Sequence, residues 1–167
     1  MQRLENFQFS KGDHMVSFDV SSLFTNVPLK ETIELITECV YSKDSKKVPP
    51  FEKKWFKKML KFATSGMFLY KNKLVRQVDG VAMGSPLGPS FANFFLGHLE
   101  KLKFFKNTQL NPKLYIRYVD DIFAVFDENT PVEPFFNHIN QQHPQIKFTV
   151  ENSVDNSLPF LGQGAQL

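Results

Sequence analysis

Residues 114–126 have the sequence LYIRYVDDIFAVF, in which two adjacent acids separate two apolar segments. Side chains alternate between the two faces of a strand, and apolar residues recur at every second position of both segments. The stretch therefore predicts a β-hairpin. Its centre contains Asp120 and Asp121 but no glycine, although tight hairpins favour Asn-Gly or Asp-Gly. The two carboxylates repel one another, which favours a functional role, but an exposed polar turn is an equally good interpretation of this pair alone.

A third acid, Asp19, lies in the apolar segment VSFDV at residues 16–20, which predicts a short buried strand. An unpaired carboxylate there would carry a large desolvation cost, so we expect a lysine, an arginine or a metal ion to neutralise it. If this strand neighbours the hairpin, Asp19, Asp120 and Asp121 converge at one edge of a sheet. Oxygen ligands without histidine or cysteine nearby favour Mg²⁺ or Mn²⁺, and paired ions of this kind are typical of nucleotidyl transfer.

The remaining pattern predicts an α+β fold. Helical periodicity follows Pro28 and recurs over residues 51–63, around residues 91–99 and over residues 134–142. Residues 67–78 predict a second hairpin, residues 80–89 a Gly/Pro-rich loop, and residues 146–150 and 158–161 two short strands. This order indicates an antiparallel sheet packed by helices on one face.

Composition sets wide limits on function. The chain has 167 residues, 42% of them hydrophobic and 22% charged, which is typical of one globular domain. Its net charge of +3 permits a polyanionic partner without requiring one. Cys39 is the only cysteine, which excludes an internal disulfide and a cysteine-based zinc site. No apolar run has the length of a membrane span and no signal peptide is recognisable, so we expect an intracellular protein without a membrane partner.

The helix expected at residues 51–63 carries apolar residues on one face and lysines mainly off it. The lysines are Lys53, Lys54, Lys57, Lys58 and Lys61. One interpretation is a solvated lysine face on an amphipathic helix. The other is an electrostatic track for a nucleic-acid backbone, which requires the helix to line a cleft.

Three segments in a fixed order carry a resemblance to a known family. They are FDVSSLFTNVP at residues 18–28, GVAMGSPLGP at residues 80–89 and YVDD at residues 118–121. They resemble the palm motifs of reverse transcriptases. Together with LPFL at residues 158–161, the sequences of these motifs are most similar to those of Penelope-like retroelements. Met83 stands where many reverse transcriptases carry glutamine, and methionine is common at this position in Penelope-like elements. The resemblance covers residues 16–161 as a palm domain, after a lead-in at residues 1–15 and before an unmatched tail at residues 162–167.

The resemblance implies a polymerase palm with an RRM-like core, and RNA-templated DNA synthesis by two-metal nucleotidyl transfer. Asp19 and Asp120 would be the principal metal ligands and Asp121 a supporting acid. Two Mg²⁺ ions are the implied cofactors, and Mn²⁺ can substitute for them. The implied partners are an RNA or DNA template with its primer, and deoxynucleoside triphosphates.

Further roles are implied for residues around the motifs. Phe24 would lie under the incoming sugar and exclude a ribose 2′-hydroxyl, which disfavours an RNA polymerase. The residues expected to contact nucleotide or template are Phe24, Met83, Gly84, Ser85, Pro86 and Tyr118, with Gln77 and Lys147 as further candidates. Several have a structural alternative. These are Phe24 as core, the glycine-rich loop as a plain turn with Ser85 as a helix N-cap and Pro86 in the first helical turn, and Lys147 as an exposed strand residue.

The pattern also departs from the family. The chain begins about one strand before the first motif, so the fingers and thumb that clamp the substrate are expected to be largely missing. Gly162 stands where the family usually has an acid. We therefore expect the isolated palm to have weak activity or none. The competing interpretations are a catalytically inactive, retroelement-derived nucleic-acid-binding remnant and an unstable pseudogene product. A nuclear location suits a retroelement enzyme, and the oligomeric state stays open.

Overall fold

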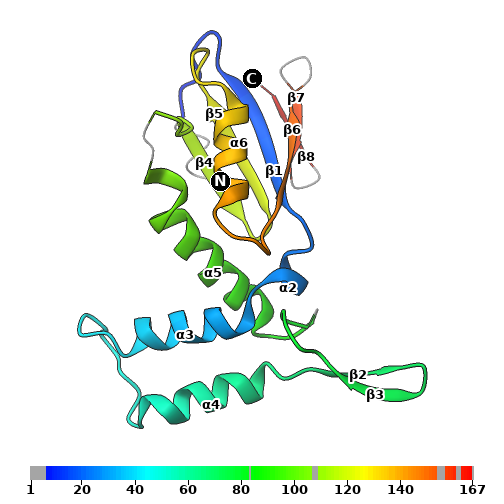
Figure 1. The fold of residues 1–167 in the computed structure, drawn as a ribbon. Coiled ribbons are helices and arrows are strands. Elements are labelled where there is room, and N and C mark those ends of the chain that lie inside the picture. Colours follow the sequence, from blue (N-terminus) through cyan, green and yellow to red (C-terminus); the bar gives the residue numbers. More distant parts are fainter. Residues whose placement is uncertain (1–6, 83, 107–108, 154–156, 161–162, 167) are drawn as a thin grey trace. The chain divides into compact units, whose positions relative to one another are not determined.

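The computed structural model describes residues 7–82, 84–106, 109–153, 157–160 and 163–166. The chain forms two compact units (Figure 1). The first unit contains the residues up to Ser21 and those from Leu99 onward, and the second contains residues 22–98. The two units are described separately below.

In the first unit, four of the described strands form an antiparallel sheet in the order β4-β5-β1-β6. The strands are β4 (Leu114–Tyr118), β5 (Asp121–Phe126), β1 (His14–Val20) and β6 (Phe148–Asn152). The hairpin and the strand at residues 16–20 are thus confirmed, and so is the pairing between them. The mixed α+β class with an antiparallel sheet is confirmed as well.

One face of this sheet is covered by helix α6 (Val132–Gln141), which lies across β5 and β1 in Figure 1. Phe135 of α6 packs against Phe18 of β1 and Phe126 of β5, with ring centroids 5.9 and 5.6 Å apart. All three rings are fully buried. Burial of a large aromatic side chain contributes about 1.5–3 kcal/mol, so this cluster stabilises the sheet–helix layer.

The opposite face of the sheet carries a smaller cluster. Met15, Phe123 and Val125 pack there against Leu158 of β7 (Ser157–Phe160). β7 pairs with β8 (Gln163–Gln166) as an antiparallel ribbon. The strand expected at residues 158–161 is therefore confirmed as far as Phe160, whereas β8 lies in residues where no strand was expected.

The second unit contains most of the helices. Its elements are α2 (Leu23–Asn26), α3 (Leu29–Val40), α4 (Lys53–Ala63), β2 (Met67–Tyr70), β3 (Lys73–Arg76) and the first part of α5 (Gly88–Leu102). A 3₁₀ turn, Phe104–Lys106, follows α5 in the first unit. Lys71 and Asn72 both have positive φ between β2 and β3, as a two-residue hairpin turn of type I′ requires. The helices after Pro28, at residues 51–63 and around Phe91 are confirmed.

Helix α4 packs beside α3 through polar contacts (Figure 1). Lys53 forms an ion pair with Glu38 at 2.5 Å, and Lys57 pairs with Glu34. The Tyr41 hydroxyl donates to the Phe51 carbonyl at 2.8 Å. These contacts turn two of the α4 lysines toward α3, so α4 does not present all its lysines to solvent.

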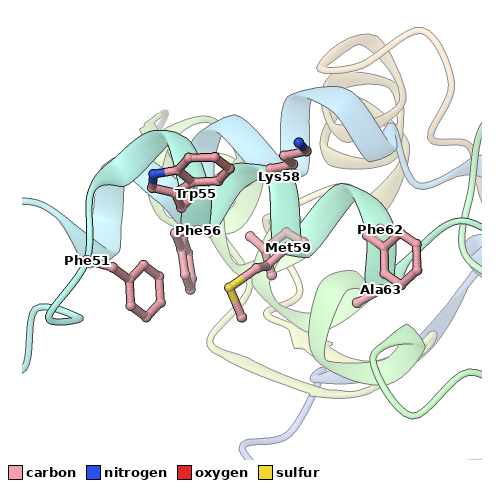
Figure 2. Close-up of a pocket in the computed structure, with 8 residues that line it drawn as sticks. Phe51, Trp55, Phe56, Lys58, Met59, Phe62 and Ala63 are labelled. Carbon is pink, nitrogen blue, oxygen red and sulfur yellow. The ribbon is translucent and has the colours of Figure 1, made fainter.

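The apolar face of α4 is present but is not part of the core. None of the side chains of α4 is buried, and Trp55 is 49% exposed and Phe62 83% exposed. Figure 2 shows aromatic and methionine side chains, together with Lys58, around an open hollow on this face. The amphipathic pattern is therefore confirmed, and its apolar face is exposed in the described structure.

Within the described residues, the helices are too short or too polar to cross a membrane.

Candidate active site

The first unit brings the carboxylates together through strand register. Asp19 of β1 is the direct cross-strand partner of Asp121 of β5, and Asp121 is in turn the partner of Tyr118 of β4. Directly opposite residues of paired strands lie on the same face of a sheet, so these side chains form one row. On the other side of Asp19, Thr149 of β6 continues the row.

Asp120 lies in the turn beside this row. The turn consists of Val119 and Asp120, and the Asp120 carbonyl accepts a hydrogen bond from the Val20 backbone at 3.3 Å. Val119 has a φ of 58°, an outlier for a β-branched residue. Strain of this kind costs about 1–3 kcal/mol and persists where surrounding contacts enforce it.

Arg117 supplies one of these contacts. Its Nη1 donates to the Val119 carbonyl at 3.0 Å, while Nε donates to Glu100 Oε1 of α5 at 2.5 Å. The Tyr115 hydroxyl also donates to Glu100 Oε1, at 2.9 Å. Burial, together with the Glu100 carboxylate, raises the pKa of Tyr115 well above its usual value. Arg117 is thus not a solvated strand residue, because its side chain ties the strained turn to α5.

The pKa values of Asp19 and Asp121 are raised by partial burial and by the neighbouring carboxylates. Partial burial raises the pKa of Asp19, and the charges of Asp120 and Asp121 raise it further against a hydrogen bond from the Val20 backbone. Partial burial and the charge of Asp120 likewise raise the pKa of Asp121. Asp19 itself is exposed at the end of β1, so the full desolvation expected for a buried strand does not apply to it. A cation bound at this edge would relieve the remaining repulsion.

The donor set fits hard divalent ions, because it consists of carboxylate oxygens at the accessible ends of the two central strands. In the described part of the chain, however, no three aspartate, glutamate, histidine or cysteine side chains are grouped as ligands of one ion. The structure thus places Asp19, Asp120 and Asp121 close together in the fold, but their side chains do not converge on one metal position.

The second unit brings Phe24 and the glycine-rich loop together. The Val81 backbone donates to the Phe24 carbonyl at 2.7 Å. Gly80 has a φ of 73°, and a Cβ at this position would lie 2.5 Å from the Thr25 carbonyl oxygen, so only glycine fits. A Cβ on Gly88 would lie 3.5 Å from the Phe24 ring. Phe24 itself is half-buried, which differs from an ordinary core position.

The loop before α5 is tightly turned. Gly84 has a φ of 87° with open space around its Cβ position, and the Ser85 backbone donates to the Ala82 carbonyl at 3.0 Å. The Ser85 hydroxyl accepts a weak bond from the Leu87 backbone at 3.4 Å. α5 begins at Gly88, so Pro86 lies before the helix and not in its first turn. Met83 lies outside the described residues.

Comparison with known proteins assigns the family. Residues 3–153 match the family model of reverse transcriptase (RNA-dependent DNA polymerase). The chain belongs to the reverse transcriptase family. No curated protein matches the sequence. The fold is similar to that of telomerase from Candida tropicalis, with a TM-score of 0.68 and 13% identity over 98% of this chain and 32% of that one.

Two further telomerase structures are similar to this reverse transcriptase domain. One is apo telomerase from Candida tropicalis truncated from its C-terminal domain, with a TM-score of 0.65, 16% identity and coverage of 92% of this chain and 34% of that one. The other is telomerase from Candida albicans in complex with a TWJ fragment of telomeric RNA, with a TM-score of 0.66, 12% identity and coverage of 99% and 32%. The reverse transcriptase domain thus spans about a third of the length of these chains.

Three further residues of the reverse transcriptase domain were predicted to contact nucleotide or template, and their exposure and hydrogen bonds differ. Tyr118 is in the carboxylate row and 62% exposed. Gln77 donates through Nε2 to the Asp79 carbonyl at 2.9 Å in the second unit. The Lys147 ammonium donates to the Asn140 carbonyl at 2.9 Å, while its own carbonyl accepts from the Ser21 backbone. Lys147 is therefore held at the end of α6, an arrangement that its sequence position did not indicate.

The sequence did not indicate one neighbour of the carboxylates, Thr149, or the partner of Arg117, Glu100. Thr149 is opposite Asp19, and Glu100 holds Arg117. The apolar-polar alternation of residues 146–150 was the only signal for Thr149, because it gave the strand but not its register. No sequence pattern indicated the role of Glu100, since its partner Arg117 is remote in the sequence.

Proposed function

We propose that this chain is the palm of an RNA-templated DNA polymerase, most similar to those of Penelope-like retroelements. The observation that carries the proposal is the register that sets Asp19 opposite Asp121, beside the strained turn that holds Asp120. In this proposal Asp19 and Asp120 hold two Mg²⁺ ions with support from Asp121, and Mn²⁺ can replace them. When bound, the ions activate the attacking 3′-hydroxyl and stabilise the triphosphate and its leaving group.

The other residues of the chain position the substrates. Phe24, which is half-buried against the Gly80–Gly88 loop, would present its ring to the sugar and exclude a 2′-hydroxyl. Gly84 is exposed and has no neighbour around its Cβ position, which lets a nucleotide or template approach the backbone closely. Arg117 and Glu100 would keep Asp120 in place through the Val119 carbonyl. The proposed partners are a primed RNA or DNA template and deoxynucleoside triphosphates.

Primer extension tests this proposal. Asp120→Asn keeps the size and hydrogen-bonding capacity of the side chain but removes a metal-binding charge. We expect it to reduce Mg²⁺-dependent incorporation of deoxynucleotides on a primed RNA template by about 10³-fold or more, because electrostatic stabilisation is the main source of catalysis in phosphoryl transfer. Asp44→Asn, which removes one exposed acid in the loop after α3, is the matched control and should retain wild-type extension.

Extension that survives Asp120→Asn would reject the proposed site. Absence of extension in the folded wild-type chain would favour the second candidate, a catalytically inactive nucleic-acid-binding remnant. That candidate has one observation in its favour, since the described acidic side chains are not grouped as ligands of a single ion.

A further inference from the structure

A groove of about 580 Å³ in the second unit gathers cationic side chains from three elements. Lys30 comes from the start of α3, Lys61 from the last turn of α4 and Arg76 from the end of β3. These positions are far apart in the sequence, so no local motif revealed the cluster. The groove lies wholly within the second unit and contains none of the carboxylates of the candidate active site.

The three cations of the groove differ from three further lysines of α4, which form ion pairs with glutamates. Lys53, Lys54 and Lys57 form ion pairs with Glu38, Glu52 and Glu34. In the described part of the chain, the salt bridges within 4.0 Å include none with Lys30, Lys61 or Arg76. The hydrogen bond from Lys57 is the main cause of the lowered pKa of Glu34, and the charges of Lys61 and Lys30 lower this pKa further.

The acid within the groove has a structural task. Asp79 Oδ1 accepts hydrogen bonds from the Leu29 backbone at 2.8 Å and from the Gly80 backbone at 2.9 Å. The first of these caps α3, so the carboxylate is held at the N-terminus of that helix. One acid against three cations leaves the groove with a net positive charge.

The groove also has an apolar wall. Leu29 and Val78 line it, and Val78 is 94% exposed. A cationic groove with exposed apolar surface suits a ligand that combines phosphate groups with a sugar and a base, whereas a bare carboxylate would leave the apolar wall unused.

We propose that this groove, lined by Lys30, Lys61 and Arg76, binds phosphate groups of a nucleic-acid strand or of a free nucleotide. The Arg76 guanidinium offers a planar fork for phosphate oxygens, and the two ammonium groups add charge from the opposite elements. The choice of ligand class rests on the proposed function, but the binding itself does not require the carboxylate site. This assigns the nucleic-acid contact to the end of α4, in place of the lysine track along the whole helix.

Fluorescence anisotropy with a labelled single-stranded thymidine 20-mer in EDTA tests the groove without metal. We expect Lys61→Gln with Arg76→Gln to weaken binding about 10-fold and to reduce the slope of log K against log salt by about 1.4, since each contact on a single strand contributes about 0.7. Lys46→Gln with Lys47→Gln removes the same charge from an exposed loop of the same unit and should change binding less than 2-fold. Lys61→Arg with Arg76→Lys keeps the charge and should retain binding.

Equal weakening by the groove pair and the loop pair would overturn the proposal, because net charge alone would then explain it. Competition separates the two sources of phosphate. Displacement of the 20-mer by dTTP at concentrations where inorganic phosphate has no effect identifies a nucleotide site, and resistance to dTTP identifies a strand-backbone site. Circular dichroism checks that each variant is folded, and Lys61→Gln alone repeats the test if the pair is not. Because this titration is done in EDTA, it does not depend on metal at the carboxylates, so failure of the polymerase proposal is distinguishable from failure of this one.

Discussion

At the scale of single residues, the candidate active site contains features that destabilise the fold. Asp19 and Asp121 are direct cross-strand partners of like charge, and Val119 beside them has a φ of 58°. Like charges opposite one another destabilise a sheet, and a left-handed β-branched residue adds strain. Such features persist where function requires them, which agrees with a site that gains its compensating charge from bound cations.

The repulsion can be measured through stability. A carboxyl whose pKa is raised in the folded state makes folding less favourable at neutral pH, and this cost disappears as the pH falls through the folded pKa. Asp19→Asn with Asp121→Asn should therefore stabilise the chain at pH 7 by about 0.2–1 kcal/mol, as expected for relief of an opposed like-charge pair. The gain should vanish near pH 3.

Urea denaturation at both pH values measures the difference. Mn²⁺ should stabilise the wild-type chain and leave the double variant unchanged, because the variant lacks two of the proposed ligands. Asp44→Asn is the control for loss of an exposed acid. A double variant less stable than the wild type at pH 7 would contradict the repulsion.

At the scale of elements, local patterns predicted more than the contacts between elements. The alternation of residues 114–126 gave the hairpin, and the acids in this segment and in the strand at residues 16–20 gave Asp19, Asp120 and Asp121 as a converging group. In the structure Asp19 and Asp121 share a row, and Asp120 lies in the turn beside it. Thr149 and the Glu100–Arg117 pair depend on register and on packing between remote segments, which no periodicity in one sequence encodes. The lysines of α4 were indistinguishable by sequence, although α3 neutralises Lys53 and Lys57 and leaves Lys61 in a cationic groove.

The glycines of the loop before α5 provide a matched test of element packing. Gly80 and Gly84 both have positive φ, but a Cβ on Gly80 would lie 2.5 Å from the Thr25 carbonyl oxygen whereas the Cβ position of Gly84 is open. Gly84→Ala should cost about 1 kcal/mol for its backbone conformation. Gly80→Ala should cost about 2–4 kcal/mol, because the clash forces the loop away from α2.

The difference between these two variants, measured by urea denaturation, reports the contact between α2 and the loop. Equal costs would show that the backbone conformation alone requires glycine at residue 80. In that case the close approach of the loop to Thr25 would not contribute to the cost of Gly80→Ala in unfolding free energy.

At the scale of the whole molecule, the apolar surface is unevenly distributed. The sheet of the first unit has buried side chains on both faces, whereas α4 and the β2–β3 hairpin of the second unit expose many large apolar residues. The exposed residues of these elements include Trp55, Met59, Phe62, Met67, Phe68, Leu69, Tyr70 and Leu74. Contiguous exposed apolar surface promotes association in water, so the solubility of this chain is limited by its second unit.

Substitution on α4 tests this inference directly. Met59 is 58% exposed and Phe62 83% exposed, so Met59→Gln with Phe62→Gln removes apolar surface without opening a cavity. We expect unfolding free energy to change by less than about 0.5 kcal/mol, as for other surface sites. Sedimentation velocity should show less concentration-dependent association than in the wild type. Val48→Gln, at a residue that is 51% exposed in the loop before α4, should leave association unchanged. Association that persists in the α4 variant would move its cause to the β2–β3 hairpin, whose side chains are exposed on both strands.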